Sequence, residues 1–355
     1  MAYTTIDDPT IYFNTKLYTG DGNSTQAVTG VGFQPNWIWI KNRTDGHWHN
    51  LNDSVRGAGA GQVLRSNTDA SEGGTSGHVS GFDSDGFTVA AGTSDAEEVN
   101  TSSDNYVAWN WKAGTSFSND ASATSVGTID SSGSVSDTAG FSIVIRTGTA
   151  SAGTIKHGLS TTPKMIITKM RNANENWGIY HVGIGNTKYL KLDVTDAEDS
   201  SSGVWNNTTP TASVFSVGSS ALVNGSGKTY VDYIFSEVKG YSKFGSYTGN
   251  GSDSGRGPYI NLGFRPAFFL LKETSGSDNW TMMDTKRLGY NPRNDHLFPN
   301  LGNAEYATDR IEMVSNGIKI RDSDGSINQS GSTYIYMAFA EAPLVNSNGV
   351  PVNAR

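Results

Sequence analysis

The sequence predicts an all-β protein built from three tandem, divergent antiparallel β-sandwich or jelly-roll-like modules. Two observations carry this prediction. Short runs of β-branched and aromatic residues alternate with turn residues, and long stretches with helical periodicity are missing. In addition, four landmarks recur three times in the same order at near-constant spacing, which indicates an internal repeat.

Each repeat begins with a proline that lies six residues before a lysine, with an apolar run between them. The run predicts a central strand covered on both sides, because both sets of alternating side chains are apolar. A tryptophan follows the lysine after seven or eight residues, and a Tyr-led apolar run closes the unit. The landmarks are Pro35, Lys41, Trp48 and Tyr106; Pro163, Lys169, Trp177 and Tyr230; and Pro266, Lys272, Trp280 and Tyr334.

These landmarks set the expected organisation of the chain. Strands are expected at 13–18, 37–41, 48–52, 62–65, 87–90 and 106–111, with matching runs at 214–217, 230–237, 318–321 and 334–340. The modules are expected at 1–114, 140–240 and 241–343. Residues 115–139 are rich in Ser, Thr, Asp and Gly, which predicts a linker or a long surface loop. Residues 344–355 predict an extended, poorly packed tail.

Composition narrows the classes of partner. The net charge is −8 and the basic residues form no cluster, so a nucleic-acid partner is not expected. Cysteine is absent, which excludes disulfides, thiolate metal sites and cysteine nucleophiles. The N-terminal residues lack the basic and apolar regions of a signal peptide, and no apolar stretch approaches the ~20 residues of a membrane span. We therefore expect a chain made in a cytoplasm, with no membrane span.

Four segments of the first repeat resemble a repeat family of tailed bacteriophages, particularly marine ones. They are GFQPNWIWIKNR (32–43), DSVRGA (53–58), FDSDGFT (82–88) and YVAWNWKAG (106–114). The third repeat keeps the pattern at 263–272 and 284–287, whereas the second has VGIG (182–185) in place of the DSVR segment.

Members of that family are generally virion structural proteins, often tail fibres or other appendages. The resemblance implies a virion protein that contacts other virion proteins and host-surface glycans. It also implies a symmetric homo-oligomer, with a trimer favoured. It supplies no catalytic residues. A capsid decoration or head-fibre adaptor without glycan binding is the alternative, and a glycan depolymerase is a weaker one.

The candidate ligand residues come from the repeat and its surroundings. Trp48, Trp177 and Trp280 could stack on sugar rings or serve as core anchors. His47 and His49 are expected on one face of a strand, where they could share a metal ion or face solvent.

Carboxylates give the remaining candidates. Asp83 and Asp85, like Asp322 and Asp324, begin an Asp-Ser-Asp-Gly sequence that suits either a calcium loop or an ordinary turn. Asp53 with Arg56, and Asp284 with Arg287, suggest structural salt links, with a polar ligand contact on the rim as the alternative. The common catalytic motifs are missing, so we expect no enzyme activity and no cofactor.

Overall fold

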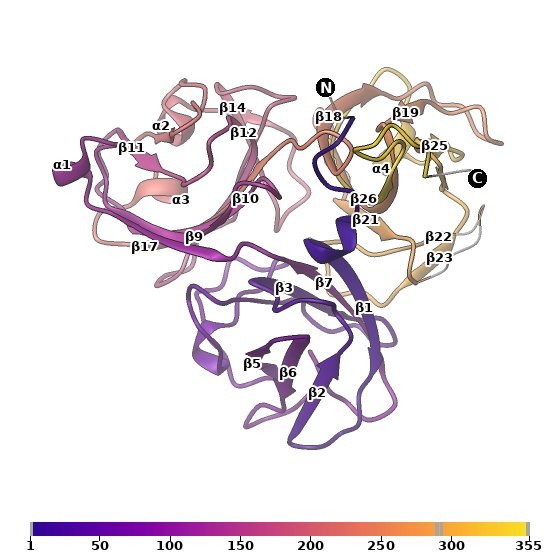
Figure 1. Cartoon of the computed structure of the whole chain (residues 1–355), viewed down its shortest axis with the longest axis horizontal. Helices are drawn as coiled ribbons and strands as arrows, with labels where there is room; N and C mark the ends of the chain where they lie inside the picture. Colours follow the sequence, from indigo (N-terminus) through magenta and orange to yellow (C-terminus); the bar gives the residue numbers. More distant parts are fainter. Residues whose placement is uncertain (1–2, 288–290, 292–293, 353–355) are drawn as a thin grey trace.

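The chain folds into a three-lobed all-β molecule, which the computed structural model describes for residues 3–287, 291 and 294–352 (Figure 1). The ladders between named strands in these ranges are antiparallel, so the predicted fold class is confirmed. Helices in the same ranges are single turns, and none is long and apolar enough to cross a membrane. The helical elements are η1 (Pro9–Ile11), η2 (Ala60–Gln62), α1 (Ala121–Thr124), α2 (Ser202–Trp205), α3 (Ala221–Asn224) and α4 (Gly325–Asn328).

The first lobe pairs a four-stranded sheet with a three-stranded one. Its strands are β1 (Phe13–Thr19), β2 (Thr25–Thr29), β3 (Trp37–Asn42), β4 (Asn50–Asp53), β5 (His78–Asp83), β6 (Gly86–Ala90) and β7 (Asn105–Trp111). The larger sheet has the order β1-β7-β3-β4 and the smaller one β2-β6-β5. Two expectations fail locally. β4 begins at Asn50, so Trp48 lies in a loop, and 62–65 contributes only a bridge between Leu51 and Leu64.

The second lobe repeats this plan with an extended sheet. Its strands are β8 (Thr115–Asn119), β9 (Ser131–Ser136), β10 (Phe141–Thr147), β11 (Gly153–Lys156), β12 (Pro163–Met170), β13 (Gly178–His181), β14 (Lys188–Lys191), β15 (Asp199–Ser200), β16 (Val214–Val217) and β17 (Thr229–Ser236). The large sheet has the order β15-β14-β13-β12-β17-β10-β9-β8, and β11 pairs with β16.

The third lobe returns to the plan of the first. Its strands are β18 (Ser242–Thr248), β19 (Tyr259–Asn261), β20 (Phe264–Glu273), β21 (Thr281–Asp284), β22 (Asn294–His296), β23 (Tyr306–Thr308), β24 (Ile311–Val314), β25 (Gly317–Ile320) and β26 (Thr333–Pro343). The sheets are β18-β26-β20-β21, β19-β25-β24 and the pair β22-β23. The first and last described residues, Tyr3 and Val352, lie at this lobe, where Tyr3 donates to Gly263 O and Val352 to Leu344 O (Figure 1).

The proline-to-lysine strands are buried on both faces, as predicted. In β3, Ile38 and Ile40 face the small sheet of their own lobe, whereas Trp37 and Trp39 face the other two lobes. Trp37 stacks on Tyr233 of β17 with ring centroids 4.3 Å apart. The inner faces of all three large sheets thus meet in one central core, so the three lobes pack around a common centre and do not stand apart as beads on a string.

One set of polar contacts links the lobes in a closed ring. The side chain eight residues after each repeat lysine reaches a backbone carbonyl of a neighbouring lobe. The contacts are Trp177 Nε1 to Arg65 O (3.0 Å), Trp280 Nε1 to Lys191 O (2.8 Å) and His49 Nε2 to Phe298 O (3.0 Å). His49 therefore occupies the position of the other two tryptophans. Its Nδ1 accepts a hydrogen bond from Trp39 Nε1, which leaves the proton on Nε2 for the carbonyl.

A second ring of contacts between lobes involves the residues four positions after His49, Trp177 and Trp280, namely Asp53, His181 and Asp284. Tyr233 of the second lobe donates to Asp53 Oδ2 at 2.8 Å, and Trp109 of the first lobe donates to Asp284 Oδ2 at 3.1 Å. In the second lobe the equivalent residue is His181, whose Nε2 lies 3.0 Å from the Tyr336 carbonyl. The predicted salt links are present here as well, because Arg56 and Arg287 contact these two aspartates with side chains that are fully buried.

A third ring uses glutamates. The backbone N–H of Glu72, Glu198 and Glu305 donates to a carbonyl of the next lobe, at Arg171 (2.7 Å), Thr274 (2.7 Å) and Arg43 (3.0 Å). The carboxylates of Glu72 and Glu305 each join two arginines from different lobes, Arg56 with Arg171 and Arg287 with Arg43. Three equivalent contacts at three interfaces make the arrangement pseudo-three-fold.

The three repeat lysines are buried and hold the loops that follow their strands. The Nζ of Lys41 donates to Asn42 O at 2.6 Å, that of Lys169 to Glu175 O at 2.5 Å, and that of Lys272 to Glu273 O at 2.6 Å. Burial lowers the pKa of Lys41 to about 7 and that of Lys169 and Lys272 to about 8. These amines act as internal hydrogen-bond donors.

Residues 115–139 are not a linker. They form the β8–β9 hairpin, which continues the large sheet of the second lobe through pairing of β9 with β10. Serine-rich strands carry few apolar side chains, and this hid the hairpin from a reading based on hydrophobic periodicity. In the predicted tail, Val345 bridges to Pro351 and Ser347 bonds to Asp7, while 353–355 lie outside the described residues.

Candidate functional site

Trp48 is the predicted sugar platform that reaches solvent. It lies in the loop between β3 and β4 and is 50% exposed. The guanidinium carbon of Arg65 lies 5.0 Å from the centre of its ring, a cation–π contact that holds the ring in place. An exposed, fixed aromatic ring can stack on the apolar side of a sugar.

Trp177 and Trp280 are buried in the central core, with 0% and 1% of their surfaces exposed. A ligand in solvent cannot reach either ring. Their indole N–H groups are used in the contacts between lobes, so these two tryptophans anchor the core. Trp48 escapes burial because it precedes the equivalent position by one residue, and His49 points inward in its place.

His47 and His49 do not share a face. His49 is fully buried, and burial holds its pKa well below the ordinary value, so its imidazole is neutral. His47 lies in the loop before β4, with Nδ1 3.2 Å from Glu97 Oε2. The expected pair at i, i+2 required a strand at 48–52. That strand begins only at Asn50, and both ring nitrogens of His49 are used in contacts with Trp39 and with the Phe298 carbonyl.

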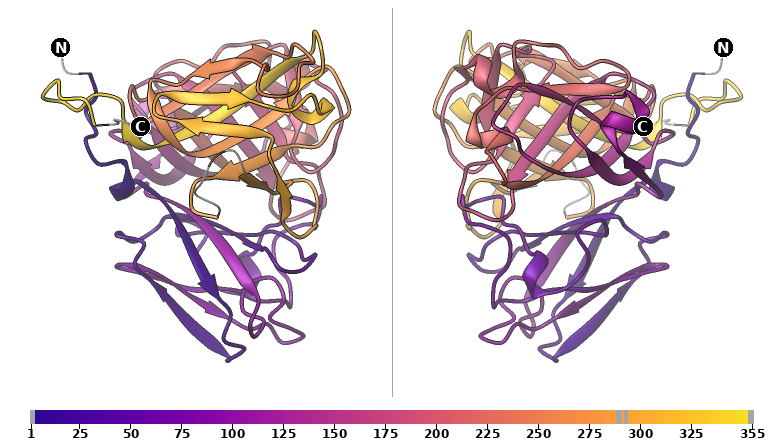
Figure 2. Two further views of the ribbon diagram at one scale, coloured as in Figure 1. Left: turned by 90° about the vertical axis from the view of Figure 1, so that its right-hand side faces the viewer. Right: turned by 90° about the vertical axis from the view of Figure 1, so that its left-hand side faces the viewer.

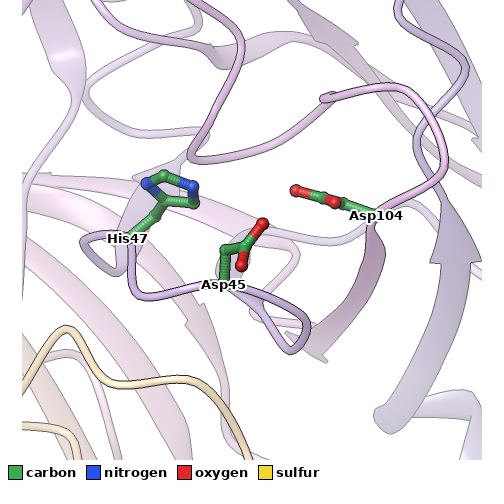
Figure 3. A group of neighbouring side chains, drawn as sticks. All are labelled: Asp45, His47 and Asp104. Atoms are coloured by element: carbon green, nitrogen blue, oxygen red, sulfur yellow. The ribbon is translucent and has the colours of Figure 1, made fainter.

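A different group surrounds His47. Figure 3 shows the side chains of Asp45, His47 and Asp104 pointing toward one another from two loops of the first lobe. One ligand atom from each lies within 4.8 Å of the others, and one nitrogen with two oxygens suits a divalent ion. Asp104 already accepts a hydrogen bond from Asn42 at 2.7 Å. An ion here would have to compete with that bond and with Glu97. Asp104 lies 57 residues from His47, and no sequence signal joined them.

The four aspartates of the possible calcium loops serve local structure. Asp83 accepts from Thr88 Oγ1 at 2.8 Å, and Asp85 accepts the backbone N–H groups of Gly30 and Gly32. Asp324 caps α4 and pairs with Arg310 at 2.8 Å, while Asp322 Oδ1 accepts the N–H of Asp324. These contacts match the turn alternative.

A hollow lies on the second lobe, beside α1. It has a volume of about 650 Å³, within the usual range of small-molecule sites, roughly 300–1,000 Å³. The β8–β9 hairpin forms one side, and the ends of β10 and β17 with Arg171 form the other. Sequence reasoning missed this site because 115–139 was expected to be a linker. The pairing of low-complexity serine strands is a long-range event that local composition does not reveal.

Comparison with protein-family models gives a match over most of the chain. The model of a family described as "Domain of unknown function (DUF7483)" matches residues 8–343, which span all three lobes. No curated protein matches the chain.

Proposed function

The chain belongs to the DUF7483 family, whose description assigns no function, and we propose that it is a structural protein of a bacteriophage virion. Within the virion we place it in a tail fibre or tail appendage that attaches to glycans at the host surface. The observation that carries the proposal is the resemblance of the first repeat, at 32–43, 53–58, 82–88 and 106–114, to phage appendage repeats.

The architecture supports a structural role. The three lobes share one core and are tied by rings of buried hydrogen bonds, which is the construction of a rigid body. The buried histidines are part of that construction, since His49 and His181 contact carbonyls of neighbouring lobes. Burial lowers the pKa of His181 to about 4, so at neutral pH it is uncharged. These groups hold lobes together and do not act as catalytic bases in this proposal.

The proposal names partners and a location. The protein is made in the host cytoplasm and is assembled with other virion proteins as a homo-oligomer, of which a trimer is the form expected for a symmetric appendage. Light scattering of the purified chain measures the mass of the assembly and hence the number of chains in it. A mass of one chain would remove the trimer from the proposal and leave the virion role intact.

A second candidate is a capsid decoration or head-fibre adaptor. The compact three-lobed shape favours it, because neither a shaft nor a coiled segment is present among the described residues (Figure 2). Electron microscopy of phage particles, labelled with antibodies to this chain, separates the two. Label at the tail supports the appendage, label on the capsid faces supports the decoration protein, and particles without label contradict both.

A depolymerase remains the weaker alternative. Incubation of the purified protein with host polysaccharide, followed by size analysis of the products, tests it. Released oligosaccharides would establish an enzyme in place of a binding protein.

A further inference from the structure

The hollow on the second lobe has a floor built by adjacent strands of one sheet. Ser118 of β8 pairs with Ser132 of β9, and Ser132 pairs with Ile145 of β10. Ile145 packs against the central core, so this row lies on the inner face of the sheet. Two residues further along β10, Thr147 lies opposite Thr229 of β17 on the same face. The hollow therefore lies on the part of this inner face that extends past the edge of the central core and is not covered by it.

The floor presents hydrogen-bonding groups that the protein itself does not use. The hydroxyls of Ser118, Ser132, Thr147 and Thr229 form no hydrogen bond within the part of the chain that the structure describes. Each can both donate and accept. Arg171 stands at one side and uses only Nε, which donates to Glu72 at 2.7 Å. Within the same described ranges its two terminal nitrogens have no partner.

Carboxylates stand on the opposite side, at the α1 turn. Asp120 caps α1 through Oδ1, and Asp130 receives the N–H of Ala121 on Oδ1 at 2.9 Å. Both aspartates are exposed and line the hollow. Hydrogen bonds from Ser122 and Ala123 lower the pKa of Asp120, so it is ionised at neutral pH. Each carboxylate keeps its second oxygen as an acceptor.

This lining selects the chemistry of a ligand. Arg146 also lines the hollow, but its side chain is buried and paired with Asp232, so the charged groups available to a ligand are the Arg171 guanidinium and the carboxylates of Asp120 and Asp130. Because groups of opposite sign stand on opposite sides, a ligand with a strong charge of one sign would be repelled at one side. Apolar side chains are few, namely Ile129 and Ile145, which argues against a lipid or a peptide with an apolar anchor. Hydroxyls, a guanidinium and carboxylate oxygens together complement a neutral molecule that carries many hydroxyl groups. Saccharides are such molecules.

The hollow also breaks the pseudo-three-fold arrangement. Among the described residues, the large sheets of the first and third lobes end at β1 and β18, whereas that of the second continues into a further hairpin. Thr147 corresponds to Thr248 of the third lobe, because each pairs with the first residue of the closing strand. Arg171 corresponds to Arg43 of the first lobe, because the carbonyl of each accepts the N–H of an equivalent glutamate. The hairpin adds a polar hollow to one lobe of a repeated structure. A feature that the other two lobes lack is a good candidate for a specific ligand site.

We infer that the hollow between the β8–β9 hairpin and Arg171 is a binding site for a short neutral saccharide. The inference rests on the proposed glycan attachment and names its site and ligand class. It places recognition on hydroxyl, guanidinium and carboxylate groups of the second lobe and not on the ring of Trp48.

The experiment uses the full chain and an array of bacterial lipopolysaccharide and capsule oligosaccharides, followed by calorimetry with the saccharide that binds most strongly. Arg171→Met removes the free donors, and Thr147→Trp fills the hollow. Arg43→Met and Thr248→Trp are the matched controls, since they make the same changes at equivalent positions that lack the hairpin. Arg43→Met also removes the equivalent link to a glutamate, so it reports the structural cost of that loss.

The expected result is at least a tenfold loss of affinity in both second-lobe variants and a change within twofold in both controls. Equal losses in the controls would overturn the inference, because the effect would then be structural. Unchanged affinity in both second-lobe variants would overturn it too, and a loss in Trp48→Ala would then move glycan attachment to the first lobe. If the wild-type chain binds no saccharide, glycan attachment itself fails, whereas antibody labelling of particles decides virion membership independently.

Discussion

The buried aspartate at the contact between the first and second lobes offers the sharpest test of the fold. We predict that Asp53→Ala lowers the free energy of unfolding by about 3–5 kcal/mol, the usual cost of removing one partner of a buried ion pair. Side chains of Asp53 and Arg56 are both 0% exposed. The loss would be a large fraction of the ~5–15 kcal/mol by which ordinary domains are stable.

The structure shows where this cost comes from. Asp53 Oδ1 accepts the N–H groups of Val55 and Arg56 at 3.0 and 2.9 Å, and Oδ2 accepts from Arg56 Nε and from the Tyr233 hydroxyl. Without the carboxylate, the guanidinium keeps Glu72 as its ionic partner, and the Tyr233 hydroxyl loses the acceptor supplied by the first lobe. Each buried donor left without an acceptor costs about 1–3 kcal/mol, so the two side-chain donors, Arg56 Nε and the Tyr233 hydroxyl, together account for about 2–6 kcal/mol, a range that includes the predicted loss.

Denaturant unfolding followed by tryptophan fluorescence measures the loss. Asp284→Ala is the matched variant, since Asp284 holds Arg287 and Trp109 in the same way, and we expect the two losses to agree within about 1 kcal/mol. His181→Ala, at the third equivalent position, should cost less, about 1–3 kcal/mol, because a neutral hydrogen bond is removed there.

Two results would refute this reasoning. A loss below about 1 kcal/mol in Asp53→Ala would mean that water enters the interface and replaces the carboxylate. Strongly unequal losses in Asp53→Ala and Asp284→Ala would mean that the two interfaces are not equivalent. The double variant Asp53→Ala/Arg56→Met should recover part of the loss, because it removes a buried guanidinium that, after the single change, keeps Glu72 but has lost its other carboxylate partner.

Two further predictions concern pH and the tryptophans. Stability should rise between pH 7 and 9.5, because the unfolded chain binds more protons there than the folded chain, in which burial lowers the pKa of Lys41 to about 7 and of Lys169 and Lys272 to about 8. Denaturant unfolding across this range at constant ionic strength measures it, and a flat or falling profile contradicts it. Trp48→Ala should cost less than about 1 kcal/mol because its ring is half exposed, whereas Trp280→Ala should cost about 3–5 kcal/mol. Thermal unfolding of the two variants measures both losses of stability. Similar losses would contradict the exposure of Trp48 and the burial of Trp280.

Local pattern was enough to predict the strands that carry the repeat. The apolar run from Trp37 to Ile40 predicted a strand covered on both sides, and its side chains do divide between two cores. The Tyr106 run divides in the same way, with Ala108 toward the small sheet and Trp109 toward the centre. Such patterns are set by the period of the strand and need no knowledge of distant contacts.

The contacts that a strand makes with distant parts of the chain could not be predicted from local sequence patterns. The sequence aligned Trp48 with Trp177 and Trp280, yet His49 is the residue that turns inward, because its imidazole reaches both Trp39 and a carbonyl of the third lobe. The shared core likewise depends on packing between residues hundreds of positions apart. The candidate site depends on a hairpin whose strands are mostly serine, so neither its pairing nor the hollow beside it had a signal in hydrophobicity.

The covalent connection of the three lobes has a genetic consequence. In a homotrimer every substitution appears three times, so a change that improves one surface is forced on the other two. Here each lobe is encoded by its own stretch of sequence, and selection can alter one without touching its neighbours. The hairpin of the second lobe and the inward-pointing His49 of the first lobe are changes of that kind, because each is present in one of three otherwise equivalent lobes.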